Sequence, residues 1–205
     1  MKKEQLLREL IDGGYLRSRA VIEAFRKVPR ENFVLPEHIR YAYANYPLPI
    51  PGQQTISQPL TVAVMTEALE PRRGDRVLEV GSGSGYQAAI LSEVVGPTGK
   101  IITTEIIPEL FEFAKKNLSG YKNVTVVHTD GSKGYEKESP YDRIIVTASA
   151  PRVPEPLAEQ LKEGGRLVIP VGDQMIIVEK NKGLQEKFLG YYAFVPLTGK
   201  HGHKP

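Results

Sequence analysis

The sequence feature that most constrains the fold is a short apolar run that leads directly into a glycine-rich turn. Residues 76–80 read Arg-Val-Leu-Glu-Val, residues 81–85 read Gly-Ser-Gly-Ser-Gly, and the apolar pattern that follows predicts a helix up to Val95. Glycine permits a tight turn and a close approach of the backbone to a ligand, while a helix start offers free N–H groups. A strand, a glycine-rich turn and a helix in this order are typical of an α/β fold.

The alternation of strand and helix continues through most of the remaining sequence. Further strands are predicted at 100–105, 124–128, 141–147, 165–171, 174–178 and 188–195, with helices at 108–118 and 157–161. The segments 165–171 and 174–178 are close enough to form a hairpin. Parallel strands that alternate with helices are joined by right-handed crossovers. The sequence therefore predicts an α/β fold with a doubly wound, mostly parallel, Rossmann-like sheet.

The first 70 residues have a different pattern. Residues 1–45 read as helical, residues 46–52 carry three prolines in alternate positions that exclude a helix, and residues 58–70 read as helical again. A chain of 205 residues has the length of one domain. We expect a single domain over 1–205, in which a helical extension and substrate-side segment (1–70) packs onto a cofactor-binding core (71–205).

Composition and charge exclude several classes of function. Lys and Arg total 27 and Asp and Glu total 24, and a net charge of +3 is too small for a protein that wraps nucleic acid. The chain has no cysteine, which excludes disulfides, thiol nucleophiles and thiolate metal sites. No segment has the apolar length of a signal peptide or a membrane span. We expect a cytoplasmic protein with no nucleic-acid, membrane or obligate protein partner.

Three acidic residues are predicted along the edge of the sheet that carries the glycine-rich turn. Glu79 lies just before the turn, and Glu105 and Asp130 follow the next two strands. Parallel sheets bind ligands at the carboxyl ends of their strands. Glu105 is placed to accept hydrogen bonds from both hydroxyls of a ribose, and Asp130 to accept one from an adenine amine. With the glycines, these acids predict an adenosine site.

Several cofactors contain adenosine, and the residues discriminate among them. Residues 83–88 match the dinucleotide pattern G-x-G-x-x-A, which favours NAD, but the Glu79 carboxylate would repel a pyrophosphate. The same carboxylate suits the cationic amino-acid end of S-adenosyl-L-methionine. A P-loop is excluded because Tyr86 and Gln87 follow the last glycine in place of Lys and Ser or Thr. A purely structural strand–helix turn is the alternative to any cofactor site.

The segment around Ser57 carries the strongest resemblance to a known family. By position alone, just before a predicted helix, a helix N-cap is the simplest interpretation of this serine. However, residues 52–59, Gly-Gln-Gln-Thr-Ile-Ser-Gln-Pro, and residues 77–88 closely resemble the protein-L-isoaspartate O-methyltransferase family. The resemblance covers nearly the whole chain and extends to the segments 28–33, 140–147, 165–172 and 195–198.

The resemblance implies a reaction, a cofactor and a set of site residues. The family transfers a methyl group from S-adenosyl-L-methionine to the α-carboxyl of L-isoaspartyl residues in age-damaged proteins and peptides, and the ester re-closes to a succinimide. It implies that Ser57 is the active-site serine near the methyl acceptor. Together with Glu79, the residues carried over for the pocket are Thr55, Ile56, Gly81, Gly85, Glu105, Asp130, Gly131 and Thr198. One departure, Thr129 where the family usually has glycine, leaves the acid in place.

This chemistry is compatible with what the sequence lacks. A carboxylate with an ordinary pKa of about 4 is ionised at neutral pH, so the reaction needs no general base. It needs no metal, and the four histidines form no ligand cluster. No G-x-S-x-G turn of a serine hydrolase surrounds Ser57, which is therefore interpreted as an orienting group. A Rossmann oxidoreductase and a non-catalytic binding domain are the competing interpretations.

Overall fold

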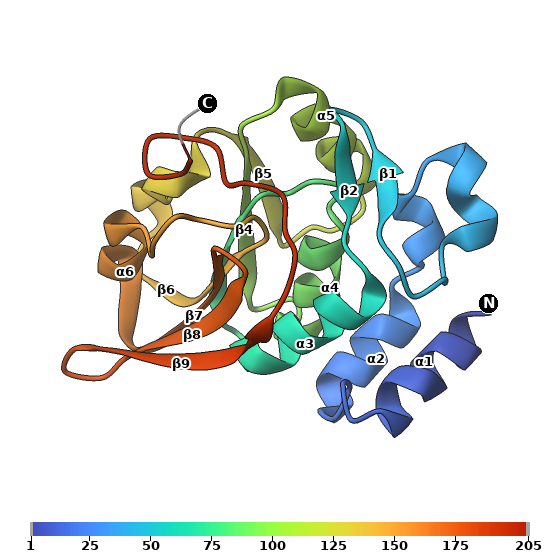
Figure 1. The fold of residues 1–205 in the computed structure, drawn as a ribbon, viewed down its shortest axis with the longest axis horizontal. Coiled ribbons are helices and arrows are strands. Elements are labelled where there is room, and N and C mark those ends of the chain that lie inside the picture. Colours follow the sequence, from blue (N-terminus) through green and yellow to red (C-terminus); the bar gives the residue numbers. More distant parts are fainter. Residues whose placement is uncertain (1, 204–205) are drawn as a thin grey trace.

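A seven-stranded sheet forms the centre of the protein, which we describe from a computed structural model covering residues 2–203 (Figure 1). The strand order is β5-β4-β3-β6-β7-β8-β9. Their bounds are β3 Arg76–Val80, β4 Lys100–Glu105, β5 Val124–His128, β6 Tyr141–Val146, β7 Leu161–Val171, β8 Gln174–Lys180 and β9 Leu184–Tyr191. The pairs from β5 to β7 are parallel, and β8 and β9 are added antiparallel. The predicted doubly wound, mostly parallel sheet is confirmed.

The point where the strand order reverses lies at β3. From β3 the chain builds outward through β4 to β5, and it then returns to place β6 on the other side of β3. The sheet is therefore built in one direction from β3 and in the opposite direction from β6. No crossover connection covers the sheet edge at the carboxyl end of β3. Ligands of open α/β sheets bind at this place.

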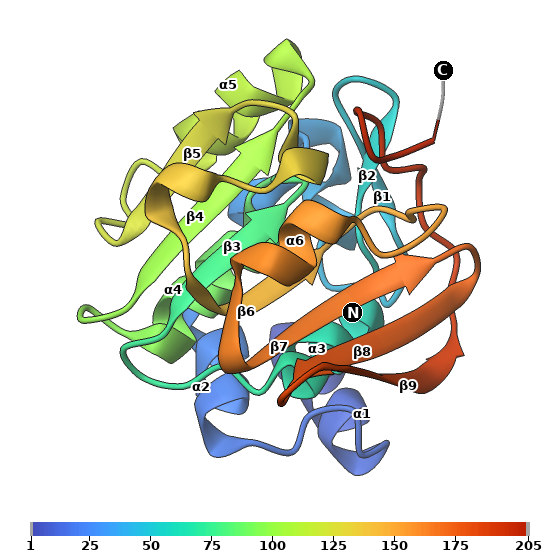
Figure 2. The same cartoon turned by 90° about the vertical axis from the view of Figure 1, so that its left-hand side faces the viewer.

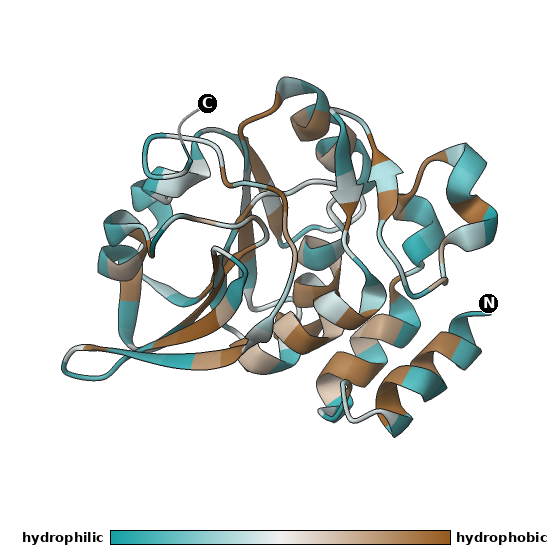
Figure 3. Ribbon diagram, in the orientation of Figure 1, coloured by the Kyte–Doolittle hydropathy of each residue, from teal (hydrophilic) through white to brown (hydrophobic). Residues whose placement is uncertain are grey.

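Helices cover both faces of the sheet. Side chains of successive strand residues point to opposite faces, so Val77 joins one apolar cluster and Leu78 the other. The first cluster contains residues of α1 Lys3–Asp12, α2 Arg19–Lys27, α3 Pro59–Leu69, α4 Tyr86–Val95 and α5 Pro108–Asn117. The second packs under the short helix α6 Glu155–Gln160, which lies in front of the strands in Figure 2. Figure 3 shows the hydrophobic residues along the strands and on one side of the N-terminal helices.

Three segments differ in detail from the sequence-based prediction. One is β7, which begins at Leu161 and not at 165, directly after α6. The proline-rich segment forms β1 Leu48–Ile50, which pairs antiparallel with β2 Gln54–Ile56, a pairing that the sequence did not indicate. The last strand begins at Leu184 and not at 188, and it ends at Tyr191. Most of β9 is solvent-exposed, so it lacks the apolar alternation by which a strand is found in a sequence.

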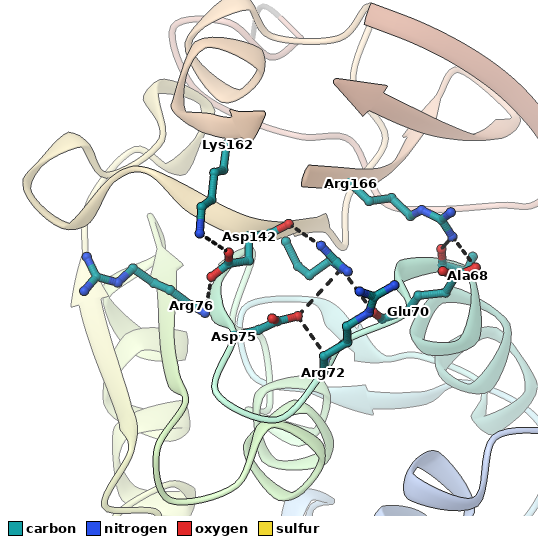
Figure 4. A network of polar contacts seen from close by, with 9 residues as sticks. Ala68, Glu70, Arg72, Asp75, Arg76, Asp142, Lys162 and Arg166 are labelled. Carbon is teal, nitrogen blue, oxygen red and sulfur yellow. Dashed lines mark hydrogen bonds and ion pairs between the residues drawn. The ribbon is translucent and has the colours of Figure 1, made fainter. Parts of the chain in front are cut away.

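A polar network holds the end of α3 on the sheet (Figure 4). The Ala68 carbonyl accepts a 2.9 Å hydrogen bond from Arg166, and the Glu70 carbonyl accepts a 3.0 Å hydrogen bond from Arg143. Arg143 also lies 3.7 Å from a carboxylate oxygen of Asp75. These arginines satisfy carbonyls that a helix end leaves unpaired. The C-terminal end of α3 is thereby fixed relative to the strands. Ser57 lies just before the other end of this helix.

Candidate active site

A pocket opens at the carboxyl ends of β3 and β4, next to the point where the strand order reverses. Eight of the residues predicted for the site line it: Thr55, Ile56, Ser57, Glu79, Gly81, Glu105, Gly131 and Thr198. They come from β2 and the residue after it, from β3 and the loop after it, from the end of β4, from the 3₁₀ helix after β5 and from the C-terminal segment. The fold thus brings residues 143 positions apart in the sequence, 55 to 198, to one cavity.

The glycine-rich turn follows the path that the sequence predicted. Gly81 has a φ of +94°, and a Cβ atom there would lie 2.5 Å from the Thr147 hydroxyl oxygen. That hydroxyl donates a 2.7 Å hydrogen bond to the Gly81 carbonyl, so the residue directly after β6 holds the turn in place. Gly85 has a φ of +87° and does not line the pocket; a Cβ there would lie 2.8 Å from Leu118. Gly85 therefore serves the turn and its packing.

Glu79 is a buried acid that has no counter-charge among the described residues. Its side chain lines the pocket and is fully buried, and neither carboxylate oxygen has a hydrogen-bond partner within residues 2–203. Burial raises its pKa to about 8, against a smaller opposite effect of Thr103. The Thr103 hydroxyl itself pairs with Ser82 Oγ at 2.7 Å. A buried, unpaired carboxylate is costly unless a cation joins it, so this pocket fits a cationic ligand group.

Glu105 is held in place by backbone amides. One carboxylate oxygen accepts hydrogen bonds from Ile106 and Ile107 N–H at 3.0 Å, and the other accepts one from Gly83 N–H at 2.9 Å. The acid at the end of β4 is therefore tied to the glycine-rich turn at the end of β3. Its remaining lone pairs are available at the pocket wall, as a ribose contact requires.

Asp130 lies differently from the expectation of an adenine contact. It is not on the pocket wall; its carboxylate accepts hydrogen bonds from Ser132 Oγ at 2.6 Å and from Lys200 N–H at 2.8 Å. Burial opposes ionisation here, but these hydrogen bonds outweigh it and lower the Asp130 pKa. The neighbouring Gly131 lines the pocket instead. Asp130 fastens the C-terminal segment that carries Thr198 across the site.

Ser57 is not the N-cap of α3. The helix begins at Pro59 and its N-cap is Gln58, which makes no side-chain cap hydrogen bond. The side chain of Asn45 accepts a 3.1 Å hydrogen bond from Leu60 N–H and so takes over part of the capping. Ser57 is half-buried on the pocket wall, and the cap interpretation of this serine is wrong.

The sequence reasoning missed further lining residues. They are Tyr86, Ile107, Leu110, Thr147 and Leu197, among others. The apolar ones gave no signal, because the same residue types build any core. Thr147 follows β6 directly, so the rule that ligands bind at strand ends was the one signal that pointed to it.

Solved structures share this fold over nearly the whole chain. A protein described as protein-L-isoaspartate O-methyltransferase matches with a TM-score of 0.89 and 34% identity over 98% of this chain and 67% of that chain. A putative protein-L-isoaspartate O-methyltransferase from Plasmodium falciparum, solved with S-adenosyl-L-homocysteine, matches with a TM-score of 0.85 and 26% identity over 97% of this chain and 99% of that one. The fold is that of S-adenosylmethionine-dependent methyltransferases.

Sequence relatives specify the family. The chain belongs to the protein-L-isoaspartate(D-aspartate) O-methyltransferase family, whose model matches residues 1–202. It is 53% identical to the protein-L-isoaspartate O-methyltransferase of Methanopyrus kandleri over 98% of this chain and 92% of that protein. It is 55% identical to the protein-L-isoaspartate O-methyltransferase of Ignicoccus hospitalis over 96% of this chain and 97% of that protein. The predicted family is confirmed.

Proposed function

We propose that this chain transfers a methyl group from S-adenosyl-L-methionine to the α-carboxyl of L-isoaspartyl residues in damaged proteins and peptides, giving the methyl ester and S-adenosyl-L-homocysteine. The family to which it belongs supports this reaction. The observation that carries the proposal at the residue level is that one pocket contains both the unpaired carboxylate of Glu79 and the segment of Ser57. A cationic cofactor group and an anionic acceptor can therefore share one cavity.

The pocket residues divide the cofactor among them. Glu79 would pair with its cationic amino-acid end, Glu105 would accept from the ribose hydroxyls, and the backbone at Gly131 would meet the adenine end. Thr198 and the segment that Asp130 fastens would close over it. When bound, S-adenosyl-L-methionine supplies a methyl group on a positively charged sulfur.

Ser57, Thr55 and Ile56 form the acceptor side of this proposal. An ionised carboxylate is already nucleophilic, so these residues have to orient it and exclude water. Ser57 donates its hydroxyl hydrogen to one carboxylate oxygen, while Ile56, which is 3% exposed, fills the wall behind it. Within residues 2–203 there is no group of three or more His, Asp or Glu side chains placed to hold a metal ion.

The organisation of the chain belongs to the same proposal. Residues 1–70 and 71–205 act as one domain, in which the first part presents the acceptor side and the second binds the cofactor. A shared apolar cluster supports this, because it joins α1–α3 to the sheet face under α4. No helix within the described residues is long and apolar enough to cross a membrane. We place the reaction in the cytoplasm, on cytoplasmic proteins.

The substrate assignment is tested with a matched pair of peptides. The isoaspartyl peptide is expected to be methylated about a hundredfold faster than the matching aspartyl peptide. The extra backbone methylene moves the free carboxylate, and a misplacement of about 1 Å lowers a rate by about a hundredfold. Methyl transfer from labelled cofactor measures both rates. Equal labelling of the two peptides contradicts the repair function. Binding of NAD in place of S-adenosyl-L-homocysteine would favour an oxidoreductase.

The ribose contact is tested by Glu105→Ala. We expect binding of S-adenosyl-L-homocysteine to weaken by about 1.5–3 kcal/mol, the range for hydrogen bonds to a charged group. Calorimetry measures the affinity, and the melting temperature reports any effect on the turn that Glu105 holds. Glu109→Ala, an exposed acid at the start of α5, is the matched control. An unchanged affinity in folded Glu105→Ala removes this residue from the cofactor site.

A further inference from the structure

Arg30 is a fully buried arginine that has no acidic partner in the part of the chain that the structure describes. It lies in the 3₁₀ helix Arg30–Phe33 and is 0% exposed. Its Nε donates a 2.8 Å hydrogen bond to the Ala42 carbonyl, and one terminal nitrogen donates a 2.8 Å hydrogen bond to the Ser57 carbonyl. The other terminal nitrogen is buried with no hydrogen-bond partner within the described residues. Two carbonyls are thus the only hydrogen-bond acceptors described for this cation.

A buried cation in this position carries a cost in stability. Burial lowers the Arg30 pKa to about 10, so the guanidinium is still charged at neutral pH. An isolated buried charge is costly, and replacing buried charged groups by apolar residues of similar volume is often neutral or stabilising. The unsatisfied terminal nitrogen adds to that cost. This cost, at a place next to a functional segment, points to a role for Arg30 besides stability.

The contacts of Arg30 connect the two sides of the active site. Its hydrogen bond reaches Ser57, on the proposed acceptor side. Its guanidinium carbon lies 4.9 Å from the ring centre of Tyr86, the first residue of α4 after the glycine-rich turn. Tyr86 lines the pocket. The Phe33 ring packs against the Tyr86 ring, with the two ring centres 5.5 Å apart. One rigid, planar group therefore contacts the acceptor segment and the base of the cofactor loop.

We propose that Arg30 is a positioning residue, whose guanidinium sets the distance and orientation of Ser57 relative to the cofactor loop. This inference rests on the proposed role of Ser57 as the group that orients the acceptor. The fork geometry is essential to it, because a guanidinium donates in fixed directions and stacks on an aromatic ring at the same time. The shorter, single ammonium of lysine cannot reproduce both hydrogen bonds and the stacking.

The test compares Arg30→Met and Arg30→Lys with the wild type. We expect both variants to lose about tenfold to a hundredfold in kcat/KM for an isoaspartyl peptide, through misplacement of Ser57. Affinity for S-adenosyl-L-homocysteine, measured by calorimetry, should be unchanged. The melting temperature of Arg30→Met reports separately what it costs to leave the Ala42 and Ser57 carbonyls without this donor. The control is Arg40→Met, which removes an exposed arginine stacked on Tyr41 at 4.7 Å and should leave all three quantities unchanged.

Several outcomes overturn the inference. Wild-type peptide kinetics in a folded Arg30→Met would exclude a positioning role, and full activity in Arg30→Lys would show that charge alone suffices. A loss of cofactor affinity that equals the loss of kcat/KM would indicate general distortion of the pocket. If Arg30→Met does not fold, the protein depends on this arginine for its stability; Arg30→Lys, which keeps the charge, then decides the positioning role.

A double-mutant cycle separates this inference from the role of Ser57. If Arg30 acts through Ser57, Arg30→Met should cost little further activity in a Ser57→Ala background, so the two losses are not additive. Additive losses contradict the coupling while leaving both residues important. If Ser57→Ala alone has wild-type kinetics, the proposed role of Ser57 fails, and a loss confined to Arg30→Met would then need a different cause.

Discussion

Without cofactor, the wild-type protein is expected to lose about 5 kcal/mol of unfolding free energy as the pH rises from about 4.5 to above 8. Glu79→Gln is expected to abolish this loss. Burial raises the Glu79 pKa from 4.5 to about 8, so the folded state holds this proton more tightly than the unfolded chain does. The favourable contribution is complete below the unfolded pKa and disappears as the pH passes the folded one. Each pKa unit corresponds to about 1.4 kcal/mol, which gives the size of the effect.

Denaturant unfolding of both proteins at about pH 5, 7 and 9 measures this difference. The change in unfolding free energy between the ends of the range should be larger for the wild type than for Glu79→Gln. Glu109→Gln, at an exposed position, serves as the control and should follow the wild type. Parallel curves for wild type and Glu79→Gln would mean that Glu79 is not a proton-holding, buried acid.

The same carboxylate links protonation to cofactor binding. A cationic group favours the ionised form of Glu79, so binding of S-adenosyl-L-homocysteine near neutral pH should release a proton. Calorimetry in buffers of different ionisation enthalpy counts that proton. In Glu79→Gln the release should disappear and the affinity should fall. If Glu79→Gln is more stable than the wild type at high pH but binds the cofactor more weakly, the unpaired carboxylate has a role in ligand binding and not in stability.

Ser57→Ala is expected to lower kcat/KM for an isoaspartyl peptide by about a hundredfold or more, in the range reported for loss of one preorganised donor in a water-excluded site. Affinity for S-adenosyl-L-homocysteine should be preserved, because the serine acts on the acceptor. The melting temperature should also be preserved, since Gln58 holds the N-cap position and the side chain of Asn45 bonds to the first turn of α3.

Peptide kinetics, calorimetry and thermal unfolding on one variant separate these effects. Ser119→Ala, an exposed serine after α5, is the matched control and should behave as wild type in all three. Wild-type peptide kinetics in folded Ser57→Ala would remove the serine from the active site. A lower melting temperature with normal kinetics in the surviving folded protein would make it a structural residue.

The sequence alone determined the α/β class, the edge of the sheet that carries the site and eight of the residues that line the pocket. Each of these depends on local chemistry that a sequence displays directly. Residues 76–85 predict a strand and a tight turn from apolar and glycine positions, and the acids Glu79 and Glu105 stand beside strand ends in the chain itself. The rule that parallel strands bind ligands at their carboxyl ends then places these residues together.

Only the tertiary structure decided which partner each polar group has. Asn45, fifteen residues before Leu60, bonds to the helix start at which position alone suggested Ser57 as the cap. The Lys200 backbone N–H donates to the Asp130 carboxylate from 70 residues away. Arg30 reads in the sequence as an ordinary charged residue, and its contact with Ser57 spans 27 positions. Hydrogen bonds depend on distance and direction in space. For partners far apart in the chain, packing sets both, so no local pattern records them.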